Sequence, residues 1–219
     1  MKFGIVVFPG SNCDRDMQDA LQHDMNKEVI MLWHKDKDIS MFTTEDCIVL
    51  PGGFSFGDYL RCGAIAHLSP MMQSVVEFAN KGGKVLGVCN GFQILCESGL
   101  LPGALLPNGN QQFVCKNIHL KNIAGNIFKI PIAHGDGRYF ADEKTLDDLE
   151  INEQVLYYYC NERGDVDKSF NPNHALRNIA GIKNRQGNVF GMMPHPERAA
   201  SVALGNTDGL KIFKELGLN

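Results

Sequence analysis

One segment restricts the possible folds more than any other, the stretch Gly83–Leu95, which reads GKVLGVCNGFQIL. A short apolar run leads into a cysteine flanked by glycines, and an apolar helical pattern follows. The residues from Gly87 to Gly91 match G-x-C-x-G, the thiol form of the strand–turn–helix elbow of hydrolases. The nucleophile of such an elbow has a strained backbone, and side chains at the flanking positions would collide with neighbouring backbone. The pattern therefore predicts a buried strand that turns sharply into a helix at Cys89.

The rest of the first half alternates strand and helix signals. Apolar runs predict strands at Lys2–Phe8, Val29–Trp33, Cys47–Leu50 and Lys84–Val88. Helices are expected from about Asp14, from Pro70 to Asn80, and after Cys89 to Gly99. The first strand is apolar on both faces, which is typical of a parallel sheet that helices cover on both sides.

The second half has a different pattern. From Leu105 onward, apolar or alternating runs follow one another without full helices between them, at Phe113–Leu120, Ile127–Ala133, Val155–Tyr159 and Ile179–Lys183. We expect these to be antiparallel additions to the parallel core, followed by a strand at Val189–Met193 and a closing helix at Asp208–Leu216. The prediction is one α/β domain over residues 1–219, with a mostly parallel central sheet and helices on both faces.

Composition excludes several classes of protein. The chain has 219 residues, 44% of them hydrophobic, so it can build a large core, and its net charge of −4 argues against nucleic acid or an anionic membrane as the main partner. No stretch approaches the roughly 20 apolar residues of a membrane span. The seven cysteines are scattered, without a C-x-x-C pair. We expect reduced thiols in a cytoplasmic protein, rather than a disulfide framework or a zinc site.

The elbow gives Cys89 two advantages as a nucleophile. It exposes the sulfur at the carboxyl end of the sheet, where open α/β folds bind ligands. It also places the sulfur near a helix N-terminus, whose partial positive charge favours the thiolate. The amide N–H of Asn90 would then point to where a tetrahedral oxyanion forms. A buried structural cysteine between two packing glycines is the alternative.

The best candidate for a general base is His195, in Met193-Pro194-His195-Pro196-Glu197. The prolines favour extended geometry for the residues that precede them, and in an extended segment residues two apart point the same way. Glu197 can then orient the imidazole, as the acid does in Cys-His-acid catalysis. A rigid surface turn with a solvated glutamate is the alternative.

Other thiols and histidines carry weaker signals. Cys13 also follows a strand, but it lacks flanking glycines and suits the start of a helix. His134 lies among glycines in a predicted loop, where it could contact a ligand or a partner. Five further histidines show no metal-ligand spacing, so we expect no metal: His23, His34, His67, His119 and His174.

Together these segments resemble the triad-type (class I) glutamine amidotransferases, which have a flavodoxin-like α/β fold. The resemblance rests on GVCNGFQ at Gly87–Gln93, on Pro51-Gly52-Gly53 after a strand, and on the late His195-Pro196-Glu197. A narrower similarity, to the glutaminase subunits of phosphoribosylformylglycinamidine synthase, covers nearly the whole chain in order. It is carried by the segments Pro9–Asp16, Pro51–Arg61, Ile132–Tyr139 and Met192–Ala199.

This resemblance implies a specific chemistry. Cys89 would attack the side-chain amide of L-glutamine, His195 would shuttle the proton, and Glu197 would orient His195. A γ-glutamyl thioester would form and water would resolve it to glutamate. The amides of Gly53 and Asn90 match the oxyanion hole of the family, and Gln93 matches a position that helps to hold glutamine. Residues of possible contact with the pocket or a partner are Phe54, Asp58, Arg61 and His134.

The resemblance also implies partners. Ammonia would pass to a large synthetase subunit, which uses ATP and magnesium to convert formylglycinamide ribonucleotide to its amidine in purine biosynthesis. A small bridging subunit is expected in the complex, and no cofactor in this subunit.

Two other readings stay open on the residues alone. One is another thiol hydrolase of the same superfamily, such as a peptidase or a chaperone-like hydrolase, although these typically lack an acid two residues after the histidine. The other is a non-catalytic glutamine-sensing module, which has no use for an activated nucleophile.

Overall fold

A nine-stranded sheet runs through the whole molecule. The computed structural model describes residues 1–219, and the strands of the sheet lie in the order β2-β1-β3-β4-β11-β10-β9-β6-β7. Their bounds are β1 Lys2–Val7, β2 Glu28–Trp33, β3 Cys47–Leu50, β4 Lys84–Val88, β6 Val114–Asn122, β7 Ile127–His134, β9 Val155–Cys160, β10 Ile179–Lys183 and β11 Val189–Met192. The helices are α1 Asp14–Asp19, α2 Pro70–Asn80, α3 Asn90–Glu97, α4 Glu143–Ile151 and α5 Asp208–Glu215.

The sheet has a parallel half and an antiparallel half. Strands β2, β1, β3, β4 and β11 are parallel neighbours. From β11 onward the pairs β11–β10, β10–β9, β9–β6 and β6–β7 are antiparallel. The predicted division into a parallel core and antiparallel additions is therefore confirmed.

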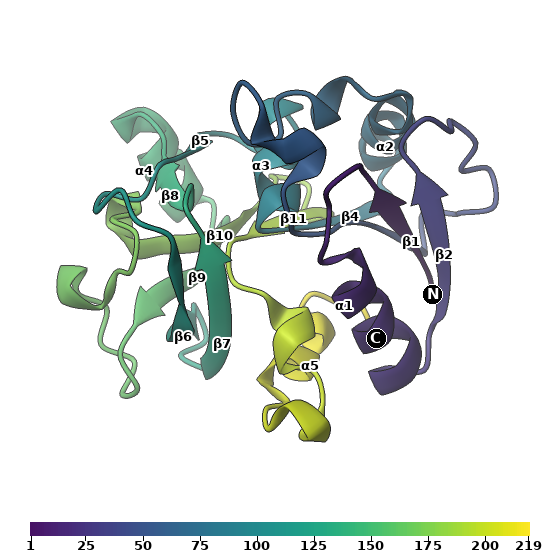
Figure 1. Cartoon of the computed structure of the whole chain (residues 1–219). Helices are drawn as coiled ribbons and strands as arrows, with labels where there is room; N and C mark the ends of the chain where they lie inside the picture. Colours follow the sequence, from purple (N-terminus) through teal and green to yellow (C-terminus); the bar gives the residue numbers. More distant parts are fainter.

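Helices cover both faces of the parallel half. In Figure 1, α2 and α3 lie above the sheet, and α1 and α5 lie below it. Burial on both faces explains why β3 and most of β4 are apolar at successive positions rather than at alternate ones. Ser69 accepts a hydrogen bond from the amide of Met72 and Pro70 occupies the first turn, so α2 begins where the sequence predicts.

The second half contains a helix that the sequence pattern did not indicate. Helix α4 lies between β8 (Arg138–Phe140) and β9, and β8 pairs with β5 (Ala104–Leu106) in a separate two-stranded sheet. The expectation of no full helix between these strands is therefore wrong, whereas the predicted closing helix is present as α5. The start of α4 has a recognisable cap, since Asp142 accepts a hydrogen bond from the amide of Thr145.

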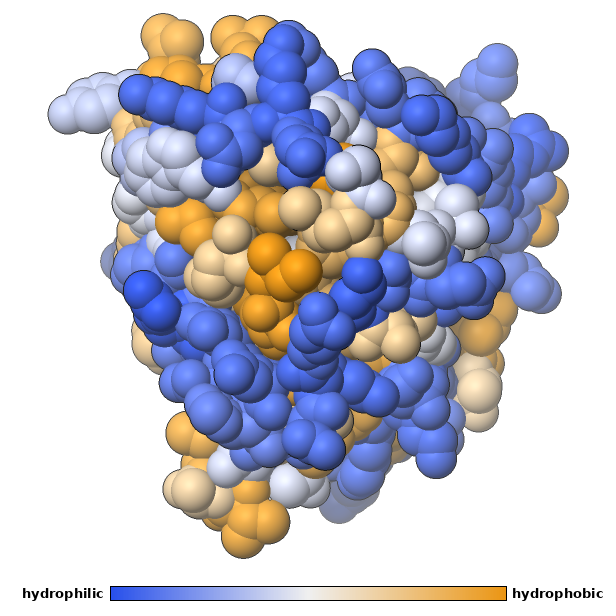
Figure 2. Space-filling view, turned by 90° about the vertical axis from the view of Figure 1, so that its right-hand side faces the viewer, coloured by the Kyte–Doolittle hydropathy of each residue, from blue (hydrophilic) through white to orange (hydrophobic).

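One edge of the large sheet is open to solvent. Strand β2 is the edge strand, and its residues Val29, Ile30 and Met31 are only partly buried. Figure 2, which looks onto the right-hand side of Figure 1, shows hydrophilic residues around a hydrophobic hollow on this side. The helices are all too short, or too polar, to cross a lipid bilayer.

Candidate active site

The elbow at Cys89 has the geometry that the sequence predicts. Cys89 has φ of 51° and ψ of −107°, and it directly precedes α3. Its flanking glycines are sterically required. A Cβ on Gly91 would lie 1.8 Å from the carbonyl oxygen of Leu50, and one on Gly87 would lie 2.6 Å from that of Gly91. The sharp turn that places the thiol at the end of β4 therefore requires glycine at both flanking positions.

The sheet register brings the histidine segment to this elbow. Met192 at the end of β11 pairs with Val88 at the end of β4, and the amide of Cys89 donates to the carbonyl of Met192 at 2.8 Å. Because parallel strands end at the same edge, the chain after β11 runs past the thiol. A Cβ on Gly52 would lie 2.7 Å from Cε1 of His195 and 3.3 Å from Cβ of Cys89, so the imidazole and the thiol border the same point.

His195 and Glu197 form a buried pair. Nδ1 of His195 lies 2.6 Å from Oε1 of Glu197, and both side chains are excluded from solvent. Burial by itself would lower the pKa of His195, but the Glu197 carboxylate and the sulfur of Cys89 outweigh it and raise the pKa to about 10. The imidazole is thus held as the imidazolium.

The backbone brings this pair together in a different way from the prediction. His195 has φ of −101° and ψ of 89°, outside the regular extended region, and Glu197 lies in a short 3₁₀ helix, Pro196–Ala199. The two side chains meet across the first turn of that helix, rather than on one face of an extended segment. Pro196 at the first helical position fixes the entry to the turn.

Two backbone amides close to the elbow are candidates for an oxyanion hole. Gly53 follows β3 and has φ of 122°, and no acceptor within the chain takes its N–H. Asn90 is the first residue of α3, where helical N–H groups have no acceptor inside the helix. A cavity of about 160 Å³ lies here, lined by Asn12, Cys13, Gly53, Phe54, Phe113, Ala133, His195 and Arg198.

The side chains of Asn90 and Gln93 tie three segments together. Oδ1 of Asn90 accepts from the amide of Ser55 at 3.3 Å, and its Nδ2 donates to Asp58 and to Gln93 at 3.2 and 2.9 Å. Nε2 of Gln93 donates to the carbonyl oxygen of Asp136 at 2.6 Å. Both ends of the Gln93 amide are therefore engaged by the protein, and the segment after Gly53 is held to the elbow helix.

The remaining predicted contact residues lie in different environments. Phe54 lines the cavity and its ring stacks against Phe113 at 6.5 Å. Asp58 is half-buried, and burial raises the pKa of its carboxyl. Arg61 lies outside the cavity and makes two hydrogen bonds, of 2.7 and 2.6 Å, to Glu97.

His134 is not in a loop, and it is not exposed to a partner. It is the last residue of β7 and only 3% exposed. Its Nδ1 lies 3.1 Å from Oδ1 of Asn108, and Nδ2 of Asn173 lies 3.5 Å from its Nε2. Burial and the neighbouring His195 charge lower the pKa of His134 to about 4, so it is neutral. Its place is beside the catalytic pair, in a buried hydrogen-bond network.

Cys13 lies closer to the catalytic pair than its sequence context indicates. It does precede a helix, α1, as expected, but its sulfur also lines the cavity beside His195. Sγ accepts a hydrogen bond from Nη2 of Arg198 at 3.1 Å, and Nε of Arg198 donates to Asp16 at 2.9 Å. The signal that could have found it is its place after β1, whose end lies at the same sheet edge as those of β3 and β4.

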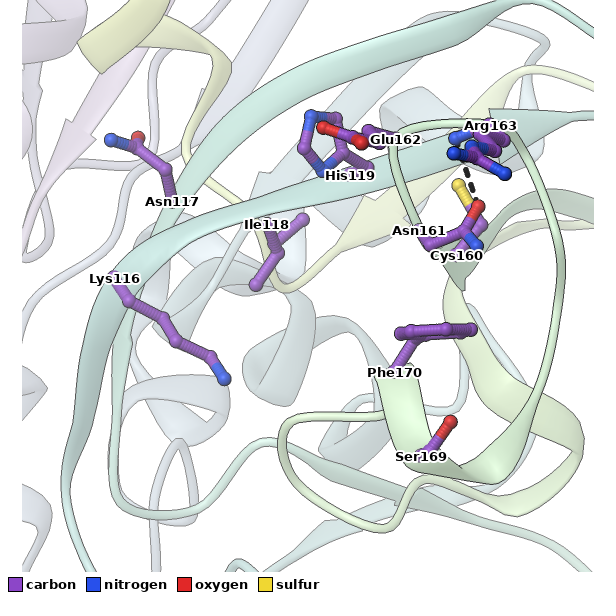
Figure 3. A pocket seen from close by; sticks show the side chains of 10 residues that line it. All are labelled: Lys116, Asn117, Ile118, His119, Cys160, Asn161, Glu162, Arg163, Ser169 and Phe170. Carbon is purple, nitrogen blue, oxygen red and sulfur yellow. Dashed lines mark hydrogen bonds between the residues drawn. The ribbon is translucent and has the colours of Figure 1, made fainter.

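None of the four other large hollows contains Cys89 or His195, although Glu197 lines one of them. One of about 510 Å³ lies between β6 and the segment after β9, and Figure 3 shows Lys116, His119 and Arg163 among its side chains. It is open and mostly polar, and it contains neither Cys89 nor His195.

Comparison with known proteins agrees with this geometry. A sequence model of the CobB/CobQ-like glutamine amidotransferase domain matches residues 1–208. A glutamine amidotransferase from Thermotoga maritima has the same fold, with a TM-score of 0.60 at 13% identity over 98% of this chain and 83% of that one. The chain is therefore a member of the glutamine amidotransferases.

More similar relatives define the group within that class. Phosphoribosylformylglycinamidine synthase subunit PurQ of Moorella thermoacetica is 52% identical over 99% of this chain and 95% of that protein. The PurQ subunit of Aquifex aeolicus is 50% identical over 99% of both. A chain of PurLQS from Thermotoga maritima superposes with a TM-score of 0.83 at 40% identity, over 98% of this chain and 96% of that one. The chain belongs to the PurQ family.

Proposed function

We propose that this chain hydrolyses L-glutamine to glutamate and ammonia, as the glutaminase subunit of a phosphoribosylformylglycinamidine synthase. The observation that carries the proposal is the meeting of Cys89, His195 and Glu197 at one edge of the sheet, with the last two buried and 2.6 Å apart. The family membership supplies the substrate class and the reaction that uses the ammonia.

In the first step the Cys89 sulfur attacks the side-chain amide carbon of glutamine. The imidazolium of His195 favours the thiolate form of a neighbouring cysteine. The carbonyl oxygen becomes an oxyanion, which the N–H groups of Gly53 and Asn90 stabilise. One such donor typically contributes about 10²- to 10³-fold in kcat.

In the second step His195 gives its proton to the departing nitrogen, and ammonia leaves. The product is a γ-glutamyl thioester on Cys89. Neutral His195 then removes a proton from water, which attacks the thioester, and glutamate is released. Glu197 holds the imidazole in one orientation and stabilises its protonated form throughout.

The pocket residues have supporting roles in this proposal. Asn90 and Gln93 link the segment after Gly53 to α3, which carries the second oxyanion donor. Phe54 and Phe113 line the mouth of the cavity, so they would restrict the access of bulk water to bound glutamine. Each end of the Gln93 amide makes one hydrogen bond within the protein, so one donor and one acceptor position remain for glutamine.

Ammonia would pass to a large synthetase subunit that makes formylglycinamidine ribonucleotide with ATP and magnesium. We expect a small bridging subunit in the same assembly. The glutaminase itself needs no cofactor in this proposal, because nucleophile, proton carrier and oxyanion donors all come from the chain. Seven free cysteines suit the reducing cytoplasm, which we take as its location.

A glutamine-analogue electrophile tests the proposal. We expect one equivalent to label Cys89 in the complex, with protection by glutamine and no labelling of Cys89→Ser. Hydrolysis of peptides instead, with indifference to the analogue, would favour a peptidase-like hydrolase. Glutamine binding without any hydrolysis in the complex would favour a sensing module. The buried Glu197 beside His195 argues against both.

A further inference from the structure

Two polar atoms of the catalytic pair have no partner in the protein. Nε2 of His195 and Oε2 of Glu197 are buried and make no hydrogen bond. Leaving a buried polar atom unpaired costs about 1–3 kcal/mol, so such atoms often mark a place where something binds. The glutaminase mechanism uses Nε2, toward Cys89, but it gives Oε2 no role.

A third buried group lies beside these two residues. The donor atoms of Cys13, His195 and Glu197 all lie within 4.8 Å of one another, and all three residues are buried. They come from two distant parts of the chain, the turn after β1 and the turn after β11. The sheet brings them together because both strands end at the same edge.

We propose that Cys13, His195 and Glu197 form a binding site for a thiophilic divalent cation, with Zn²⁺ the best fit, and that the bound cation stops glutamine hydrolysis. The inhibition rests on the proposed roles of His195 and Glu197, whereas the binding does not. The site would be an inhibitory metal site, not a catalytic one.

The donor set selects the metal. A thiolate, an imidazole and a carboxylate are ligands that Zn²⁺ takes at about 2.0–2.3 Å, whereas Mg²⁺ and Ca²⁺ prefer oxygen alone. The three donor atoms already lie within 4.8 Å of one another, so at most a small inward movement of the side chains would bring them to the spacing of ligands around one tetrahedral ion. The adjoining cavity of about 160 Å³, lined by Cys13 and His195, gives the ion a path and leaves room for a water as fourth ligand.

Binding exchanges protons for the metal. Burial raises the pKa of the Cys13 thiol to about 12, despite the opposing effect of Arg198, so the ion must displace its proton. The ion also replaces the proton that His195 and Glu197 share. The thiolate and carboxylate then balance the two positive charges. The positive charge of Arg198, beside Cys13, opposes the binding of a cation. Asp16 partly neutralises this charge through its hydrogen bond of 2.9 Å with Arg198.

The consequence for catalysis is direct. A cation held by His195 and Glu197 occupies the imidazole that must carry the proton and breaks the 2.6 Å contact that orients it. Glutamine hydrolysis then stops even though Cys89 is untouched.

The binding is tested with Co²⁺, whose bond to a thiolate gives a charge-transfer band in the near ultraviolet. The Cys89→Ala variant removes the catalytic thiol, and Cys13→Ala and Cys13→Ser remove the proposed ligand. The serine variant can still accept from Arg198, which guards against misfolding. Cys115→Ala, at an exposed position on β6, is the matched control.

We expect the band in the unmodified chain, in Cys89→Ala and in Cys115→Ala, and its loss in both Cys13 variants. A band that persists in the Cys13 variants and disappears in Cys89→Ala would overturn the proposal, because the catalytic thiol would then be the ligand. Absence of any band from the unmodified chain would overturn it as well.

The inhibition is tested in the reconstituted complex, with each variant compared with its own zinc-free rate. The Zn²⁺ concentration for half-inhibition should rise at least about tenfold in Cys13→Ser, since loss of an outer partner alone costs 10- to 100-fold in affinity. An unchanged value would overturn the inhibitory role. If zinc-free complexes fail to hydrolyse glutamine, the proposed function fails, while the Co²⁺ spectrum still reports on the site.

Discussion

Nδ1 of His195 and Oε1 of Glu197 lie 2.6 Å apart, and neither side chain is exposed to solvent. A charged pair is tolerated in the interior when each partner compensates the other, and removal of one partner leaves a buried charge that costs about 3–5 kcal/mol. This one contact therefore links the chemistry of the site to the stability of the fold.

The charge of Glu197 should matter for rate. Glu197→Gln keeps the shape but removes the carboxylate, so it should lower kcat for glutamine hydrolysis by about 10³- to 10⁴-fold, because the imidazole loses its orientation and the imidazolium its partner. Steady-state kinetics of the complex measure this. The exposed Glu162 supplies the control variant, Glu162→Gln, which should behave as the unmodified chain. A loss below tenfold would remove Glu197 from the mechanism.

The pair should also give stability a pH dependence. The pKa of His195 is raised from its usual value to about 10 in the folded protein. Its stabilising contribution is therefore complete below about pH 6.5 and is lost as pH rises through about 10. We expect the stability difference between the unmodified chain and Glu197→Gln to shrink over this range. Urea unfolding at several pH values checks it, and a constant difference would contradict the shift.

Substitution of Gly91, the second glycine of the elbow, should reduce both stability and activity. A Cβ there would lie 1.8 Å from the carbonyl oxygen of Leu50, so Gly91→Ala must push α3 away from β3. We expect a loss of more than about 2 kcal/mol in the free energy of unfolding, together with loss of activity. Gly135→Ala is the control, since its Cβ would meet only Phe113, at 3.9 Å. Equal stability of both variants would show the elbow to be looser than described.

How far the sequence predicts this structure depends on the range of the interactions. The elbow, the start of α2 at Pro70 and the division of the sheet follow from short patterns, and they are confirmed. Helix α4 was missed because its polar, acidic stretch has few apolar positions, although Asp142 marks its start. The approach of Cys13 to His195 and the burial of His134 depend on strand order, which one sequence does not contain.

Activity should depend on the partner subunit. The segment after Gly53 exposes Phe54, Tyr59 and Leu60 by 47%, 74% and 90%, and Phe56, Asp58 and Leu60 have positive φ. Exposed apolar side chains on a strained backbone are typical of a segment that reaches its active conformation only when a partner binds to it. We expect little glutaminase activity from the isolated chain, and a large increase with the synthetase subunit.

Leu60→Asp should reduce that activation, while Ile151→Asp, at another exposed apolar position at the end of α4, should not. Ammonia release assays with and without the partner measure both effects. Full turnover by the isolated chain, unchanged when the partner is added, would contradict activation by the partner.

In the proposed mechanism, Cys89 is the nucleophile that releases ammonia for the partner. The most direct measurement is synthesis by a reconstituted complex that contains Cys89→Ala, with either glutamine or ammonium as the nitrogen source. We expect glutamine-dependent synthesis to be lost and ammonium-dependent synthesis to be kept. Loss of both would make Cys89 a structural residue, and retention of glutamine-dependent synthesis would place the nucleophile elsewhere.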